Sequence, residues 1–143
     1  GQDENKREPF KWYDVSGPGQ TTWRTSNFNT GAWQPSLETQ QGDPDSLWSH
    51  YRRLIHLREN NLCLKVGSIT PVDTGNKQVV GFLREWKDEQ VLVLHNLNAA
   101  WQDVMLDLNQ AANWRTLYSD GEFEWESTIR LSPRSSLIVA HED

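Results

Sequence analysis

From residue 62 to the C-terminus, the sequence is a series of short, alternating apolar segments with no helical segment between them. "KQVVGFLREW" and "EQVLVLHNL" flank the turn-like "KDE" and predict a β-hairpin. "WQDVMLDL", "NWRTLYS", "STIRLSP" and "SSLIVAH" continue the series, and "DGE" is a strong turn signal. About seven short strands at roughly ten-residue spacing favour an antiparallel β-sandwich. The predicted fold class is therefore mainly β, with residues 62–143 forming the sandwich.

One amphipathic helix is predicted over residues 43–61. Asp43 is the expected N-cap, and Pro44 suits the first helical position. Asn60 and Asn61 form the expected stop, in the left-handed conformation. The spacing i, i+4, i+7, i+8 of one apolar face is followed by Leu47, Tyr51, Leu54 and Ile55. A helix with such a face needs a large partner to cover it.

Residues 1–41 differ from the rest of the chain in composition and in the pattern of their apolar residues. They are rich in Gly, Pro, Ser, Thr, Asn and Gln, and their apolar residues follow neither a strand nor a helix period. This pattern predicts a long loop. Because compact domains seldom contain so long a loop, we expect it to be functional or to belong to a larger structure.

Charge and composition exclude several classes of partner. A net charge of −6 argues against nucleic acid and against an anionic membrane surface. The single cysteine, Cys63, allows neither a disulfide within the chain nor a cysteine-based metal site. Eight tryptophans are spread along the chain. A flat indole can stack on a sugar ring, but tryptophan is also a common large core residue.

The sequence contains no complete catalytic constellation. Four acids crowd its opening: Asp3, Glu4, Glu8 and Asp14. A glycosidase needs two carboxyl groups on a rigid scaffold, so acids in a loop rich in Gly and Pro are interpreted as solvated or loop-capping groups. His50 and His56 lack the i, i+4 spacing of helical metal ligands, and we predict neither a metal site nor a cofactor.

Several segments together resemble one known family. "ENKREPFKWYD", "GQTTW" and "PSLETQQGDPDSLWSHYRRLIHLREN" resemble the end of the catalytic (β/α)8 barrel of glycoside hydrolase family 13, the α-amylase and oligo-α-glucosidase family. Its "Arg-x-Pro-[Met/Phe]-x-Trp" signature is matched from Arg7 to Trp12. "VVGFLREWKDEQVLVLHNLN" resembles the central hairpin of the family's C-terminal domain. The resemblance implies that residues 1–61 are the loop after barrel strand 8 and the last barrel helix. It implies that residues 62–143 are the C-terminal β-sandwich.

The resemblance also implies a function. The intact parent is expected to be a bacterial, retaining hydrolase of α-glucosidic bonds in maltodextrin- or starch-type oligosaccharides. In the family, the catalytic aspartates and glutamate lie on earlier barrel strands, so this chain should hold no catalytic residue and be inactive alone. The family's signature arginine binds a sugar hydroxyl, which assigns Arg7, with Trp12, to substrate binding in the parent. The other interpretation of Arg7 is a brace for its own loop.

Partners and alternatives follow from the same expectation. The expected partners are the missing N-terminal catalytic barrel and an α-glucan oligosaccharide. A different class of function is a stand-alone starch- or glycan-binding β-sandwich module, which the tryptophans motivate. A third is self-association through the barrel-facing surface. The sequence leaves open the preference for α-1,4 or α-1,6 linkages and the compartment in which the parent works.

Overall fold

The computed structural model describes residues 3–27, 34–106 and 113–142. The chain forms two compact units, Gly1–His56 and Leu57–Asp143, called here the N-terminal and the C-terminal unit. The division at residue 61 that the family resemblance suggests concerns the intact parent and stays a prediction. None of the described helices is long and apolar enough to cross a membrane.

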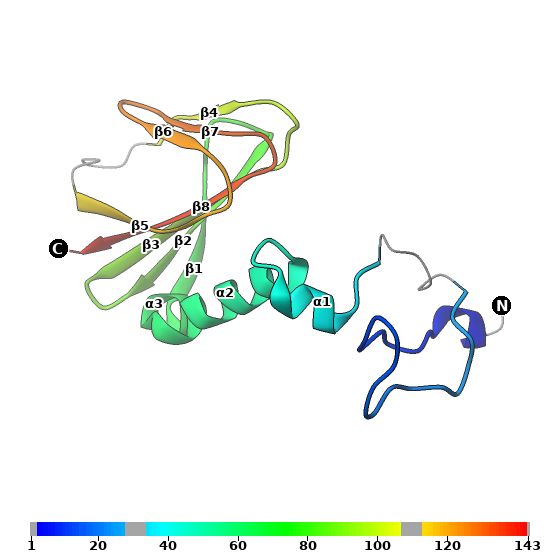
Figure 1. Cartoon of the computed structure of the whole chain (residues 1–143). Coiled ribbons are helices and arrows are strands. Elements are labelled where there is room, and N and C mark those ends of the chain that lie inside the picture. Colours follow the sequence, from blue (N-terminus) through cyan, green and yellow to red (C-terminus); the bar gives the residue numbers. More distant parts are fainter. Residues whose placement is uncertain (1–2, 28–33, 107–112, 143) are drawn as a thin grey trace. The chain divides into compact units, whose positions relative to one another are not determined.

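The C-terminal unit is built from two antiparallel sheets (Figure 1). Sheet A has the order β1-β2-β3-β8-β5, with β1 at Ser68–Val72, β2 at Val79–Trp86, β3 at Glu89–Asn96, β8 at Ser136–Glu142 and β5 at Trp114–Ser119. Sheet B has the order β4-β7-β6, with β4 at Gln102–Val104, β7 at Ile129–Leu131 and β6 at Phe123–Trp125. The predicted mainly β fold with an antiparallel sandwich is confirmed.

The hairpin that the sequence predicted is the centre of sheet A. Trp86 of β2 pairs with Glu89 of β3, and the two strands stay in register to the pair of Val79 and Asn96. Lys87 in the turn has a φ of 54°, the left-handed conformation that a tight hairpin turn requires. Of the strand predicted around "WQDVMLDL", β4 covers Gln102–Val104, and Leu106 lies beyond its end. Leu108 lies outside the described residues.

The hydrophobic core lies between the two sheets. Alternate residues of the strands point inward, and the buried cluster consists of Val79, Leu92, Leu94, Val104, Ile129, Leu131, Leu137 and Val139. Each such side chain contributes roughly 1.5–3 kcal/mol on burial. The sandwich therefore has the apolar interior that the strand alternation predicted.

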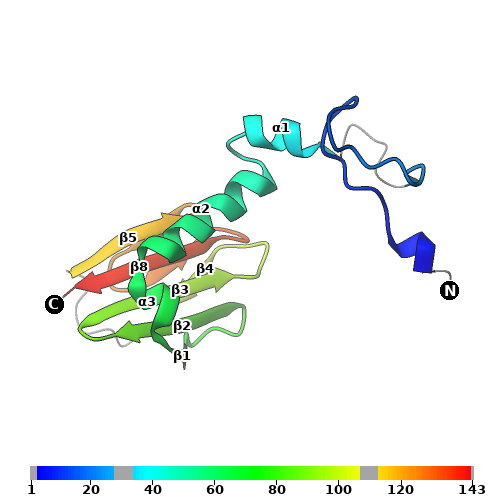
Figure 2. The same cartoon turned by 90° about the horizontal axis from the view of Figure 1, so that it is seen from below.

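The outer face of sheet A is covered in part by a short helix, α3, at Leu62–Val66 (Figure 2). The Asn61 side chain caps this helix by accepting a hydrogen bond from the Leu64 backbone N–H at 2.9 Å. Cys63 of α3 is fully buried, and its burial raises the pKa of the thiol. The predicted end of the helix at Asn60 is confirmed, but neither Asn60 nor Asn61 is left-handed, because Asn61 is extended as the N-cap of α3.

The main helix, α2, begins later than the sequence predicted. It spans Leu47–Asn60, and Asp43 is not its N-cap. Asp43 instead accepts a hydrogen bond from the Asp45 backbone N–H at 2.9 Å, closing a local turn. Ser46 is buried and accepts from the Ser49 backbone N–H at 3.2 Å, which is the bond of an N-cap.

A further helix, α1, was not predicted from the sequence pattern. It spans Leu37–Gly42, and all but its last residue lie in the segment 1–41 that was predicted to be loop. Ser36 caps it by accepting from the Thr39 backbone N–H at 3.1 Å. Six residues are too few to show a helical hydrophobic period, so its cap was the only available signal.

Candidate functional site

The N-terminal unit is organised by hydrogen bonds between its opening segment and α1. The Leu37 backbone N–H donates to the Lys11 carbonyl at 2.9 Å, and the Glu38 N–H donates to the Trp12 carbonyl at 3.0 Å. The Thr39 hydroxyl donates to Asp14 Oδ2 at 2.6 Å. The stretch from residue 11 to residue 14 is thereby fixed along the first turn of a helix.

Alternate side chains of this segment lie on two different sides, one facing the cavity and one facing solvent. Pro9, Lys11 and Tyr13 line a cavity of about 480 Å³ within the unit. Phe10 and Trp12, between them, are exposed and pack edge to face, with ring centroids 4.7 Å apart. One short segment thus presents a polar pocket on one side and a pair of aromatic rings on the other.

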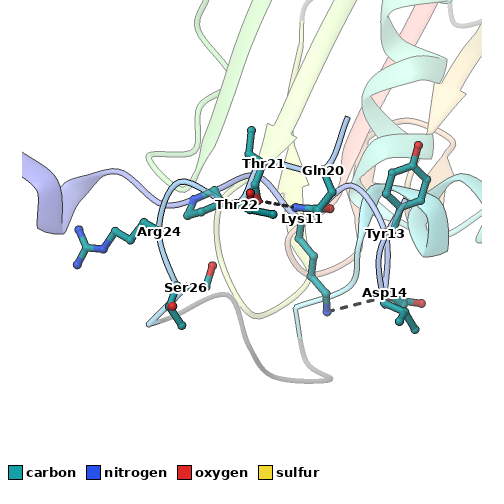
Figure 3. Close-up of a pocket in the computed structure, with 11 residues that line it drawn as sticks. Lys11, Tyr13, Asp14, Gln20, Thr21, Thr22, Arg24 and Ser26 are labelled. Atoms are coloured by element: carbon teal, nitrogen blue, oxygen red, sulfur yellow. Dashed lines mark hydrogen bonds and ion pairs between the residues drawn. The ribbon is translucent and has the colours of Figure 1, made fainter. Parts of the chain in front are cut away.

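The pocket is lined mostly by hydrogen-bonding groups (Figure 3). Lys11, Asp14, Gln20 and Arg24 contribute charged or amide side chains, and threonine and serine hydroxyls surround them. The Lys11 ammonium points toward Asp14, with 3.9 Å between Nζ and Oδ1. The Gln20 amide nitrogen donates to the Phe10 carbonyl at 3.0 Å, while its buried Oε1 accepts no hydrogen bond within the described part of the chain. A ligand hydroxyl could satisfy that oxygen.

Asp14 is held in its ionised form. The hydrogen bond from the Thr39 hydroxyl is the main cause of its lowered pKa, and hydrogen bonds from Ser36 add to it. Asp14 is therefore a carboxylate at neutral pH and can accept hydrogen bonds from hydroxyl groups. It is the single acid among the described lining residues, whereas glycoside hydrolysis needs two carboxyl groups.

The substitution Thr39→Val is expected to raise the pKa of Asp14 toward its ordinary value, since it removes the hydroxyl donor. Because the pKa is lowered in the folded chain, the stabilisation exists above the unfolded pKa and is lost as pH falls through the folded value. The change would be seen in an NMR titration of the Asp14 carboxyl carbon. Thr22→Val is the matched control, because Thr22 lines the same pocket; an unchanged Asp14 pKa in Thr39→Val would contradict the assignment.

The two residues predicted to bind substrate lie outside this pocket. Arg7 follows a 3-10 helix at Asp3–Lys6 and forms an ion pair with Asp3, with Nη2 and Oδ2 2.8 Å apart. Trp12 has 42% of its surface exposed. Neither residue lines the cavity, although the neighbours of Trp12 do. The substrate roles of Arg7 and Trp12 stay predictions about the intact parent.

The opening acids serve the loop, as interpreted from the sequence, wherever their side chains are described. Asp3 pairs with Arg7, and Glu8 Oε1 accepts from the Asn27 backbone N–H at 2.7 Å. Asp14 accepts from Thr39. In the described ranges, no group of three or more His, Cys, Asp and Glu side chains is gathered closely enough to hold a metal ion.

His95 and Ser136, which are paired in sheet A, lie beside Asp120 after the end of β5, but the three do not form a catalytic triad. His95 Nδ1 and Ser136 Oγ are 2.9 Å apart, while Asp120 accepts from the Ser136 backbone N–H instead of from the imidazole. Burial lowers the pKa of His95, and the Asp120 charge opposes that shift. A triad needs the carboxylate to orient the imidazole, so this set has a structural role.

The comparisons with known proteins match both units. Residues 69–138 match the family model described as maltogenic amylase, C-terminal domain. Alpha-amylase 3 of Dictyoglomus thermophilum is 31% identical over 138 residues, covering 96% of this chain. The chain belongs to glycoside hydrolase family 13. Oligo-1,6-glucosidase of Bacillus cereus is 31% identical over 99 residues, covering 67% of this family 13 chain.

Solved structures agree with the sequence relatives. The crystal structure of an alpha-amylase from H. orenii superimposes with a TM-score of 0.77 at 31% identity, covering 95% of this family 13 chain. The chain spans 28% of the length of that structure and of the Dictyoglomus relative, and 17% of the Bacillus relative. The activity of a whole family 13 protein is therefore a property to be proposed for the parent and tested.

The pocket residues themselves were missed from the sequence. Lys11, Gln20 and Arg24 lie at irregular spacings within one loop, and no single motif contains all three. The available signal was the alternation in "PFKW", where Phe10 and Trp12 alternate with Pro9 and Lys11. That pattern predicts a short segment with two different faces, and in Pro9 to Tyr13 alternate side chains line the cavity while the two between them are exposed.

Proposed function

We propose that this chain is the C-terminal part of a retaining hydrolase that acts on α-glucosidic bonds of maltodextrin- and starch-type oligosaccharides, and that it is inactive alone. Family membership supports the glycosidase class. The observation that carries the proposed inactivity is the single carboxylate, Asp14, in the described pocket, since retention requires a second carboxyl group about 5 Å away.

The proposed role of the N-terminal unit is to bind sugar hydroxyls at the mouth of the active site. The pocket offers a fixed carboxylate, a cation and a buried amide oxygen that has no donor among the described residues, which suit a ligand with many hydroxyl groups. The exposed pair of Phe10 and Trp12 offers flat apolar rings for stacking on a pyranose. We assign Arg7 and Trp12 to substrate binding in the parent on the family signature that they match.

The proposed partner is the N-terminal catalytic barrel of the parent. On α2, Leu47, Tyr51 and Ile55 are spaced at i, i+4 and i+8, and each has more than half of its surface exposed. Exposed apolar side chains gathered on one helix face usually mark an interface. Packing α2 against the preceding barrel helices would cover this stripe, and self-association of the isolated chain through it is the competing outcome.

Activity measurements test this proposal. The isolated chain is expected to release no p-nitrophenol from a chromogenic α-glucoside above a heat-denatured control. The full-length parent is expected to hydrolyse maltooligosaccharides and to release the α-anomer first, as followed by proton NMR. Turnover by the isolated chain would contradict the proposed inactivity, and release of the β-anomer would contradict the retaining route.

A further inference from the structure

The outer face of sheet B carries a row of charged side chains across its three strands. Arg130 of β7 is in register with Asp103 of β4 on one side and with Glu124 of β6 on the other. Their neighbours Val104 and Ile129 are buried in the core, so the alternation of the strands directs the charged row outward. Figure 1 shows sheet B on the side of the sandwich away from α3.

Trp101 adds an aromatic ring to the same face. It lies two residues before Asp103, and the Arg130 guanidinium carbon is 5.3 Å from its ring centroid. The ring is only partly buried. The other two tryptophans near this sheet differ, because Trp125 and Trp114 pack against the core. Trp101, Asp103, Glu124 and Arg130 together are called the sheet B platform.

The two ion pairs of the sheet B platform are longer than normal charge-assisted hydrogen bonds. Arg130 Nε is 3.5 Å from Asp103 Oδ1, and Arg130 Nη1 is 3.6 Å from Glu124 Oε2. Charge-assisted hydrogen bonds are normally about 2.7–2.9 Å long, so both contacts are loose. About half of the Arg130 side chain is exposed, and both carboxylates are more exposed still. Such surface ion pairs add little stability, so fold stability alone does not explain the row.

The charges of the platform restrict the ligand. Two carboxylates, with the exposed Glu122 and Glu126 on either side of Glu124, repel phosphates and other anions. The central guanidinium opposes a compact cation. A neutral molecule with many hydroxyl groups can bind both kinds of charged group, since its hydroxyls donate to the carboxylates and accept from the guanidinium. Exposed cation–π contacts are weak, so a sugar ring could displace Arg130 from the Trp101 face and stack there.

We propose that the sheet B platform is a binding site for a neutral α-glucan chain, separate from the pocket of the N-terminal unit. The sugar class rests on the proposed function, whereas the platform itself rests on the four side chains. The C-terminal unit thereby holds a glycan chain at its surface while the parent acts elsewhere on it. A single stacking ring with exposed polar flanks predicts weak binding in the millimolar range.

The test is a calorimetric titration of the 143-residue chain with maltoheptaose. Saturable binding is expected, and Trp101→Ala should weaken it about tenfold or more, as buried or stacked tryptophans in interfaces do. Trp86→Ala is the matched control, because Trp86 is an exposed tryptophan at the end of β2 in the same unit. This control is expected to bind maltoheptaose like the unchanged chain.

A second variant tests the platform in case Trp101→Ala weakens binding only because it misfolds. Asp103→Asn with Glu124→Gln keeps the shape of the platform and removes its charge-assisted acceptors, so weaker binding with an unchanged melting temperature is expected. Unchanged affinity in both this variant and a folded Trp101→Ala would overturn the proposal. A flat maltoheptaose trace would overturn it too, and would leave the proposed function standing, since activity of the full-length parent tests that separately.

Discussion

Replacing Asn96 by alanine is expected to lower the free energy of unfolding of the C-terminal unit by about 3 kcal/mol. For a unit of this size, that loss corresponds to a melting temperature lower by about 10 °C or more. Thermal unfolding followed by near-UV circular dichroism would measure the change. The effect is expected to be large because the Asn96 side chain connects the two sheets.

The contacts of Asn96 explain this expectation. The residue is 2% exposed at the end of β3. Its amide nitrogen donates to the carbonyls of Ala100, Leu131 and Ser132 at 2.9, 3.2 and 2.7 Å, so one N–H is shared between two acceptors. Its Oδ1 accepts from the Asn98 backbone N–H at 2.9 Å. Alanine would remove all four bonds and would leave the buried Leu131 carbonyl without this donor.

Two further variants distinguish the loss of the Asn96 hydrogen bonds from the effect of replacing any asparagine nearby. Asn98→Ala removes a bond to the Ala100 N–H and an exposed bond to Gln78, and it is expected to cost less than about 1 kcal/mol. Asn96→Asp would place a carboxylate oxygen against the carbonyls of β7 and should be at least as damaging as alanine. Equal stability of Asn96→Ala and Asn98→Ala would show that the connection between the sheets is not a main stabilising element.

Asn96 also illustrates what the sequence could predict. It ends the "VLVLHN" strand, within the segment that resembles the family's central hairpin, but no local pattern explains why an asparagine stands there. Its acceptors on Leu131 and Ser132 lie more than 30 residues away, so the reason for the residue is a tertiary contact. The hairpin of β2 and β3 could be predicted because its signals, alternation and a turn, are local.

The helices show the same distinction at a smaller scale. The apolar spacing from Leu47 to Ile55 predicted α2, whereas its start was predicted at the wrong residue. Asp43 and Ser46 are both good capping residues, and the choice between them depends on the Ser46 hydroxyl, which donates to the Gln40 carbonyl at 2.6 Å. Because Gln40 belongs to α1, which sequence periodicity does not show, the capping residue could not be chosen from the sequence.

The candidate site was the least predictable feature. Arg7 and Trp12 were selected through a family signature, while the pocket is lined by side chains between residues 9 and 26 that are brought together by the contact with α1. The decisive bond, from Thr39 to Asp14, joins residues 25 positions apart. Loop positions of this kind depend on single long-range hydrogen bonds, and no periodicity in the sequence reports them.

In the full-length parent, Arg7→Ala is expected to lower kcat/KM for maltooligosaccharides about a hundredfold, or about 2.7 kcal/mol. The proposed cause is the loss of charge-assisted hydrogen bonds from the guanidinium to a sugar hydroxyl at the mouth of the active site. Steady-state kinetics on maltotriose would measure it. If KM increased while kcat stayed unchanged, Arg7 would bind the substrate and the transition state equally strongly.

The exposure of Arg7 makes this prediction specific to substrate binding. Its side chain is 72% exposed and that of its partner Asp3 is 67% exposed, so their ion pair contributes at most about 1 kcal/mol to the fold. Asp3→Ala is therefore the matched control, and kcat/KM should stay within about twofold of the parent value. Arg7→Lys should recover only part of the loss, because an ammonium lacks the planar fork of donors. If Arg7→Ala and Asp3→Ala reduced kcat/KM equally, Arg7 would be a brace of its own loop and not a ligand of the sugar.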